Sequence, residues 1–493
     1  MKLSPELARW REVIEGHAKT MGLDFFETVF EVLDYGEMNE VASFGGFPTR
    51  YPHWRFGMEY ERMSKSFRYG LHRIYELVIN NDPCYAYLLA SNPVVDQKLV
   101  MAHVYGHCDF FKNNYYFSFT NRKMIDEMAN HATKVRRFID TIGLDKVEEF
   151  LDLGLSLENL IDHMSPYVRR ISPPEKLPAK DVDEPLTPKK LRSKDYMETF
   201  INPPAYLEKQ KQKLERAKQK KESATPEPIR DVLTFLIEHA PLKQWQAEIL
   251  EIVRNEAYYF NPQAMTKIMN EGWATYWHRR IMTKKVLTDS EVIDYAETMS
   301  GTLQSAGTSL NPYQLGLALW EDLEERWNTG RHGLEFDRCD DVETKRRWNT
   351  GAMAGRDKVF EVRRLHCDVT FIDEFLTEDF CHREKLFLYG WNPRTQRKEL
   401  LSRDFKQVKA QLLRQLTNGG HPVIDVVDSN HRNRGELVLE HKWEQSDLRD
   451  DYAKATLENI RRIWTRPVRL LTRQGEKSVA YVADAEGVRL EDN

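Results

Sequence analysis

The sequence has 493 residues, 41% hydrophobic and 30% charged, so it is long enough for several domains and a large core. Its 72 basic and 77 acidic side chains give a net charge of −5, which argues against a nucleic-acid partner for the chain as a whole. It contains no run of about 18 uninterrupted apolar residues, so we expect no membrane-spanning segment.

The cysteines and the N-terminus indicate the compartment. The five cysteines are scattered and form no C-x-x-C pair, so neither a disulfide framework nor a zinc ribbon is predicted. The chain begins with the pattern of an amphipathic helix and not with a charged-then-apolar signal peptide. We therefore expect a cytoplasmic protein.

Residues 1–165 are mostly helical in pattern. Apolar residues recur at three- and four-residue steps from Leu3 to Ile14, as an amphipathic helix requires. The stretch 42–57, rich in glycine, proline and aromatic residues, is too apolar for a solvated linker and predicts an ordered loop packed on the domain. Further helices are predicted over about 63–80 and 93–112.

The second of these helices carries the most informative motif of the chain. His103 and His107 are four residues apart, so a helix places both imidazoles on one face. The surrounding residues are apolar nearly all round, which predicts a buried helix. Two buried histidines need partners, and these are either a metal ion or hydrogen-bonding groups in a purely structural core.

Residues 166–228 differ in composition from the rest. The segment is rich in proline and contains a lysine-rich stretch at 208–221, so it has little apolar surface to bury. We expect a long strap with one exposed helix. Its basic helix is either solvated surface or a contact for an acidic partner.

Helical periodicity returns over 229–370, and we expect this block to pack with 1–165 as one discontinuous helical domain. Pro262 is placed at the start of a helix that runs to Lys285. Glu271 and His278 lie on one stripe of that helix, among tryptophan and tyrosine residues. A buried carboxylate is costly unless it is paired or bound to a metal, so Glu271 is a candidate ligand.

Other polar residues on helical stretches are candidates for the same interior site. Glu127 and His131 form a second pair with four-residue spacing, and Tyr313 is a candidate hydrogen-bond donor to a developing oxyanion. Asp109 either orients an imidazole or is a charge on the helix face. The alternative for the whole set is ordinary core packing.

From about residue 371 the pattern changes to a two-residue period. Strands are predicted near 385–390, 422–427, 435–440 and 467–471, helices over 402–416 and 448–464, and a hairpin over 478–490. We therefore predict an α+β C-terminal domain over 371–493, smaller than the helical part.

Five stretches resemble the stage V sporulation protein R (SpoVR) family. They are spread over the helical portion and include both the two-histidine motif and the glutamate motif, at residues 44–57, 79–87, 101–114, 270–278 and 311–317. The family is named for a role in formation of the spore cortex. The resemblance implies association with a PrkA-type serine kinase and with a companion protein encoded beside it.

The glutamate stretch is also similar to the third-ligand region of gluzincin metallopeptidases. In that resemblance His103, His107 and Glu271 match the metal ligands, and the helical domain is zincin-like. Val104 stands where those enzymes have the glutamate that activates water. The site is therefore either catalytically inactive or uses Glu127, His131 or His278 to take the proton.

Three functions remain open from the sequence. The first is a metal-dependent amide hydrolase acting on a cell-wall peptide or a protein, with zinc favoured and another divalent metal as the alternative. There, His278 or Tyr313 stabilises the oxyanion. The second is a non-enzymatic regulatory or adaptor protein that works with the kinase. The third is an iron-dependent oxidase that uses Glu127/His131 together with His103/His107.

Overall fold

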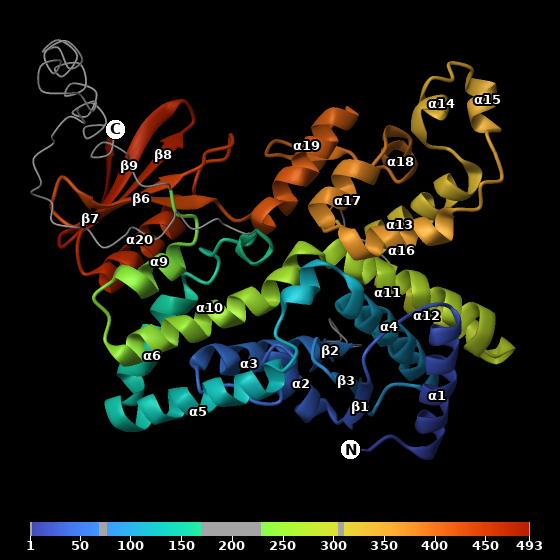
Figure 1. Ribbon diagram of the computed structural model, residues 1–493, viewed down its shortest axis with the longest axis horizontal. Helices are drawn as coiled ribbons and strands as arrows, with labels where there is room; N and C mark the ends of the chain where they lie inside the picture. Colours follow the sequence, from blue (N-terminus) through green and yellow to red (C-terminus); the bar gives the residue numbers. More distant parts are fainter. Residues whose placement is uncertain (1, 69–75, 169–227, 304–309, 493) are drawn as a thin grey trace, which may run out of the picture. The chain divides into compact units, whose positions relative to one another are not determined.

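The computed structural model describes residues 2–68, 76–168, 228–303 and 310–492 (Figure 1). It divides into two compact units: Met1–His163 with Leu242–Pro422, and Met164–Pro241 with Val423–Asn493. Nearly all of the predicted strap, including the lysine-rich stretch at 208–221, lies outside the described residues.

The first unit is mainly helical and contains two small sheets. Its strands are β1 (Thr28–Leu33), β2 (Leu77–Ile79), β3 (Cys84–Leu89), β4 (Leu388–Asn392) and β5 (Arg397–Ser402). Its helices of eight or more residues are α1 (Pro5–Thr20), α2 (Tyr35–Ser43), α3 (Trp54–Arg68), α4 (Val94–Asn113), α5 (Met124–Ile142), α6 (Leu144–Leu155), α10 (Gln244–Met265), α11 (Lys267–Ile281), α12 (Val292–Leu303), α13 (Pro312–Thr329), α16 (Gly355–Leu365), α17 (Asp368–Phe375) and α19 (Phe405–Leu416). Shorter helices are α14 (Gly333–Asp337), α15 (Val342–Arg346) and α18 (Glu378–Arg383).

The first sheet was not predicted from the sequence. Its strand order is β1–β3–β2, with β1 parallel to β3 and β2 antiparallel to β3. The predicted helix over 63–80 is therefore wrong at its end, where Leu77–Ile79 form β2. β3 is a short and almost wholly buried strand, and such a strand lacks the alternation that distinguishes a strand from a buried helix.

The core of the first unit forms around α4. This helix is buried from Val95 to Phe111, as its apolar sequence predicts, and it packs against α1 and α11. Helix α11 also packs against α13, which in turn packs against α16. The loop before α3 is ordered and packed as expected, since Phe47 and Tyr51 are each 1% exposed.

Helix α11 begins later than the sequence suggested. Pro262 lies inside α10, which ends at Met265, and α11 starts at Lys267. The first turn of α11 receives its cap from far along the chain, because Asp368 accepts hydrogen bonds from the backbone N–H groups of Ile268 and Met269 (2.8 and 2.9 Å).

The segment 371–422 belongs to the first unit, although the sequence placed it in the C-terminal domain. Phe371, Ile372 and Phe375 of α17 are buried in the same core as α4 and α11. The ring of Phe371 lies 4.7 Å from that of Trp320. Burial of these apolar side chains attaches the segment to the helical core. The change of periodicity near residue 371 therefore does not mark a domain boundary.

The second unit contains a five-stranded sheet of order β10–β9–β8–β7–β6. Its elements are α9 (Val232–His239), β6 (Ile424–His431), β7 (Glu436–His441), α20 (Asp450–Trp464), β8 (Val468–Gln474), β9 (Lys477–Asp484) and β10 (Gly487–Asp492). β7 and β8 are parallel and are connected through α20, whose apolar face packs on the sheet. The strands and the helix predicted beyond residue 422 are confirmed.

The chain is thus mainly α with a smaller sheet-containing C-terminal part. None of the described helices combines the length and the apolar character needed to cross a bilayer.

Candidate metal centre

The two histidines of α4 lie on one buried face, as their spacing predicts. His103 and His107 are 2% and 3% exposed, and their ring centroids are 4.6 Å apart. The outward nitrogen of each ring, Nε2, faces two carboxylates.

Glycines on neighbouring helices bring the glutamate to this face. A Cβ on Gly106 of α4 would lie 2.7 Å from the Cα of Ala274 in α11. A Cβ on Gly272 would lie 2.5 Å from the Cα of Gly316 in α13. Only helices without side chains at these positions can approach so closely, and this approach places Glu271 beside the two imidazoles.

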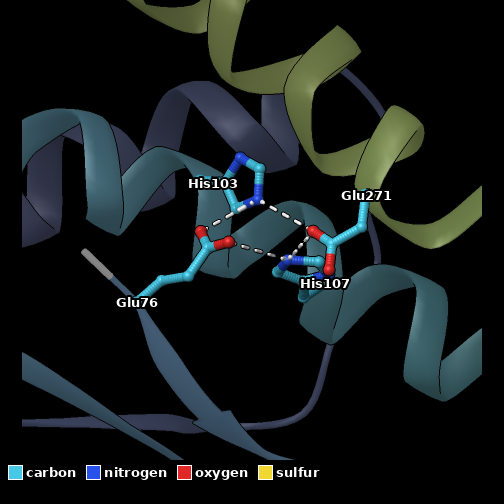
Figure 2. Close-up of side chains that lie close together, drawn as sticks. All are labelled: Glu76, His103, His107 and Glu271. Carbon is cyan, nitrogen blue, oxygen red and sulfur yellow. Dashed lines mark ion pairs between the residues drawn. The ribbon is translucent and has the colours of Figure 1, made fainter. Parts of the chain in front are cut away.

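Four donor groups converge at this point. Glu76, which directly precedes β2, joins His103, His107 and Glu271, and one donor atom from each lies within 4.8 Å of the others. Figure 2 shows these side chains pointing toward one another from α4, from α11 and from the residue before β2. Glu76 was missed from the sequence, because a single acidic residue before a short apolar strand carries no periodic signal.

The separations within the group fit a metal coordination shell. His103 Nε2 is 2.9 Å from Glu76 Oε2 and 3.8 Å from Glu271 Oε2. His107 Nε2 is 4.0 Å from Glu76 Oε1 and 3.4 Å from Glu271 Oε2. Two ligands at about 2.0–2.1 Å from a tetrahedral zinc ion are about 3.3 Å apart, and the four distances lie on both sides of that value.

Hydrogen bonds at the inner nitrogens fix the direction of both imidazoles. His107 Nδ1–H donates to Asn270 Oδ1 at 2.9 Å, which leaves a lone pair on Nε2 of the neutral ring. His103 Nδ1 lies 2.8 Å from His278 Nδ1, and His278 Nε2 lies 3.0 Å from Met299 Sδ. Such partners on the second nitrogen are the usual support of metal-binding histidines.

Two buried atoms of the group make no hydrogen bond within the part of the chain that the structure describes. They are His103 Nε2 and Glu271 Oε2. The contact of His103 Nε2 with Glu76 is close, but it lacks hydrogen-bond geometry. Buried polar atoms without partners are costly, so this position fits a further positively charged species.

The electrostatics of the group are dominated by its carboxylates. Burial opposes the charged form of His103, but Glu76 and Glu271 outweigh burial and raise the pKa of His103 to about 9. Burial also opposes the ionised form of Glu271, yet the two neighbouring imidazoles outweigh burial and lower its pKa. Among the described residues no lysine or arginine forms an ion pair with Glu76 or Glu271.

Tyr313 and His278 contact the group without joining it. The Tyr313 hydroxyl donates to Glu76 Oε1 at 3.0 Å, so in this structure it holds the carboxylate. His278 is 2% exposed, and both its ring nitrogens have partners. Burial is the main cause of its pKa lying well below the ordinary value.

Glu127 and His131 lie in a different polar cluster. They are on α5, which packs against α6 and α10. His131 Nδ1–H donates to Glu256 Oε1 at 3.1 Å, and its Nε2 is 3.3 Å from Glu127. Arg50 forms an ion pair with the other oxygen of Glu256 at 2.5 Å. The structure therefore does not bring the Glu127/His131 pair together with His103 and His107.

Asp109 has neither of the roles considered from the sequence. Its side chain is fully buried and accepts a hydrogen bond from Trp273 Nε1 at 2.8 Å. It also forms an ion pair with Arg363 at 3.4 Å. Asp109 thus connects α4 with α11 and α16, and Asn270 is the residue that orients His107.

Comparison with known proteins identifies the family. The sequence model described as "SpoVR like protein" matches residues 2–421. The chain belongs to the SpoVR-like family. The model described as "SpoVR-like C-terminal domain" matches residues 422–475, which lie in the second unit.

A curated relative of this SpoVR-like chain is "Uncharacterized protein YcgB" of Escherichia coli (strain K12). The two are 33% identical over 326 residues, which are 63% of this chain and 62% of the relative. The match thus spans less than two thirds of that protein's length. A comparison with solved structures finds no match.

Three of the five stretches that carry the SpoVR resemblance lie around the four-residue group. Residues 101–113 belong to α4, 270–278 to α11 and 312–317 to the start of α13. They supply both histidines, Glu271, the orienting Asn270, Tyr313, and the glycines at which the helices touch. The family resemblance and the geometry therefore point to the same part of the fold.

Proposed function

We propose that this chain is a metal-dependent hydrolase of the SpoVR-like family that acts on an amide bond. His103, His107 and Glu271 hold a divalent cation, with zinc as the first candidate. One observation carries the proposal: two imidazoles and two carboxylates face one another in a buried group to which no described lysine or arginine is paired.

The donor set fits a zinc ion. Two histidines and one glutamate form the ligand set of one large class of zinc hydrolases, which leave the fourth position to water or substrate. His103 Nε2 and Glu271 Oε2 are buried atoms that a cation would satisfy. The similarity of residues 270–278 to gluzincin metallopeptidases supports the same three ligands.

Glu76 takes the place of the general base that Val104 cannot provide. A bound cation of this class polarises the scissile carbonyl and lowers the pKa of a water molecule. The carboxylate of Glu76 lies within 4.0 Å of both imidazoles, so it would lie beside a cation held by them and could take a proton from water there. Tyr313 holds this carboxylate through its 3.0 Å hydrogen bond and is a positioning residue in this scheme.

His278 has a supporting role in the same scheme. Its ring nitrogens contact His103 and Met299, so it orients the imidazole of His103 and has no nitrogen left for a substrate. The proton transfer expected from Glu127, His131 or His278 is thus assigned to Glu76.

The test is a metal analysis of full-length protein purified without added metal. We expect about one zinc per chain in the wild type, and less than about a tenth of that in His103→Ala/His107→Ala. His131→Ala is the matched control, because it removes a buried histidine that contacts Glu127 and Glu256, outside the metal centre. An intact fold without metal in the wild type would contradict the proposal and favour the regulatory or adaptor function.

The variant Glu76→Gln distinguishes two roles of Glu76, as the general base or as a fourth metal ligand. If Glu76 is the base, the variant keeps its zinc and loses about 10²–10⁴-fold of any turnover of an internally quenched peptide mixture. If Glu76 is a permanent ligand, the zinc content itself falls, and the site is closed like a structural one. That second result would overturn the hydrolase and leave a structural metal centre.

A further inference from the structure

Strands β4 and β5 form a two-stranded hairpin in the first unit. Among the described strands they pair only with each other. Four large apolar side chains of this hairpin are exposed: Tyr389 (42%), Trp391 (62%), Leu400 (42%) and Leu401 (71%). An isolated two-stranded sheet is marginally stable in water, and apolar exposure of this kind is typical of an interaction surface.

The apolar side chains lie on both faces of the hairpin. Tyr389 is opposite Leu400 and Trp391 is opposite Lys398 in the strand register, so these four share one face. The register shifts beside Tyr389, and Leu401 lies against Gly390, where an added Cβ would be 2.5 Å from Leu401 Cδ1. A protein partner that docks on a sheet covers one face, whereas a lipid interface surrounds a hairpin that enters it.

The hairpin and its flanks are basic, although the chain as a whole is acidic. Residues 385–406 contain six cationic and two anionic side chains, a net charge of +4, against −5 for the whole chain. Arg394, Arg397 and Lys398 are exposed and form no ion pair with the described residues. The carboxylate of Glu399 is occupied by Asn392 and Thr395 (2.8 and 2.7 Å).

We propose that the β4–β5 hairpin docks on an anionic lipid surface. Tryptophan and tyrosine favour the interface between headgroups and acyl chains, and the exposed leucines add apolar area there. Unpaired arginine and lysine beside them attract anionic headgroups. The chemistry differs from that of a single-stranded nucleic acid, because leucines on both faces offer no stacking surface for bases. A second copy of the hairpin would bring like charges together.

Flotation of the full chain with vesicles tests this surface. We expect binding to phosphatidylcholine vesicles that contain phosphatidylglycerol, no binding to pure phosphatidylcholine, and release at high salt. Arg394→Gln/Arg397→Gln should weaken binding by roughly 20- to 30-fold, about fivefold for each cation near the surface. Trp391→Ser should abolish the blue shift of tryptophan emission on binding.

The control variant is Leu334→Ser, which removes a side chain that is 69% exposed on α14 and should bind like the wild type. The changed residues are all exposed, so their variants should keep the wild-type melting temperature. Absence of flotation at low salt, or wild-type flotation of Trp391→Ser, would overturn the proposal. A different outcome is that the chain binds no lipid but binds an oligonucleotide or a second copy of itself, and that Trp391→Ser loses this binding. That outcome would overturn the lipid proposal in favour of a nucleic-acid or self-association surface. Chelators should have no effect, because the hairpin does not depend on the metal centre.

Discussion

Two buried clusters of histidine and glutamate lie in the same helical unit and differ in how their charge is balanced. In the cluster around Glu256, Arg50 supplies a positive charge at 2.5 Å and His131 donates a hydrogen bond. In the cluster around Glu76 and Glu271, the facing groups are the two imidazoles of α4. The first is balanced by the protein's own side chains, and the second fits an added cation.

The difference shows that residue type and spacing do not define a metal centre. Glu127 and His131 have the same four-residue separation as His103 and His107, and both pairs contain buried histidine. What separates them is the guanidinium of Arg50, which comes from a distant loop and makes the cluster around Glu256 self-sufficient. The following changes test this contrast, from the largest expected effect to the smallest.

Replacing Arg50 by methionine should have the largest effect. It leaves the carboxylate of Glu256 buried without its arginine, so the free energy of unfolding should fall by about 3–5 kcal/mol. Denaturant unfolding of the variant measures the loss. Adding Glu256→Gln to the variant should restore part of the stability, because the unpaired charge is then gone. Wild-type stability of Arg50→Met would show that this cluster is not held by its ion pair.

Removing metal from the cluster around Glu76 and Glu271 should destabilise the wild type. A ligand at about a hundredfold excess over its dissociation constant contributes about 2.7 kcal/mol, so a chelator should lower the melting temperature of the metal-loaded protein. Arg50→Met should keep this response and His103→Ala/His107→Ala should lose it. Equal shifts in the wild type and the double variant would contradict the contrast between the clusters.

Gly272→Ala tests the close approach that forms the site. The new Cβ would meet backbone atoms of Gly316, which cannot turn aside, so we expect a loss of about 1–3 kcal/mol in thermal unfolding together with a lower metal content. Gly57→Ala is the control, because nothing lies within 4 Å of its Cβ position in helix α3. It should be neutral or slightly stabilising. A variant at Gly272 as stable as that control would refute the packing argument.

Asn270→Ala should have the smallest effect. It removes the acceptor for His107 Nδ1–H, so we expect metal affinity to fall by about 10–100-fold in a competition titration with a chromophoric chelator. Asn261→Ala removes a similar contact, with His163 Nδ1 at 2.5 Å, outside the metal centre. It should leave metal affinity unchanged. The same loss in both variants would indicate a general effect on folding.

Much of the fold could be predicted from periodicity. The helices around Leu7, His103 and Glu271 and the strands beyond residue 422 follow from their apolar patterns. The three-stranded sheet beside α4 could not be predicted, because its strands are short and the central one, β3, is almost wholly buried and lacks alternation. The segment 371–422 was assigned to the C-terminal domain because the pattern changes to a two-residue period near residue 371, whereas the packing of Phe371 cannot be read from the sequence.

The sequence by itself determined which residues belong together on one element: the spacing of His103 and His107, the apolar surroundings of Glu271, and the stretches that mark the SpoVR-like family. Only the tertiary structure decided that Glu76 completes the group, that Glu127 and His131 do not join it, and that Asp368 caps α11. The reason is physical. Periodicity reports contacts within one element, whereas charge balance and helix caps depend on atoms that folding brings from distant parts of the chain.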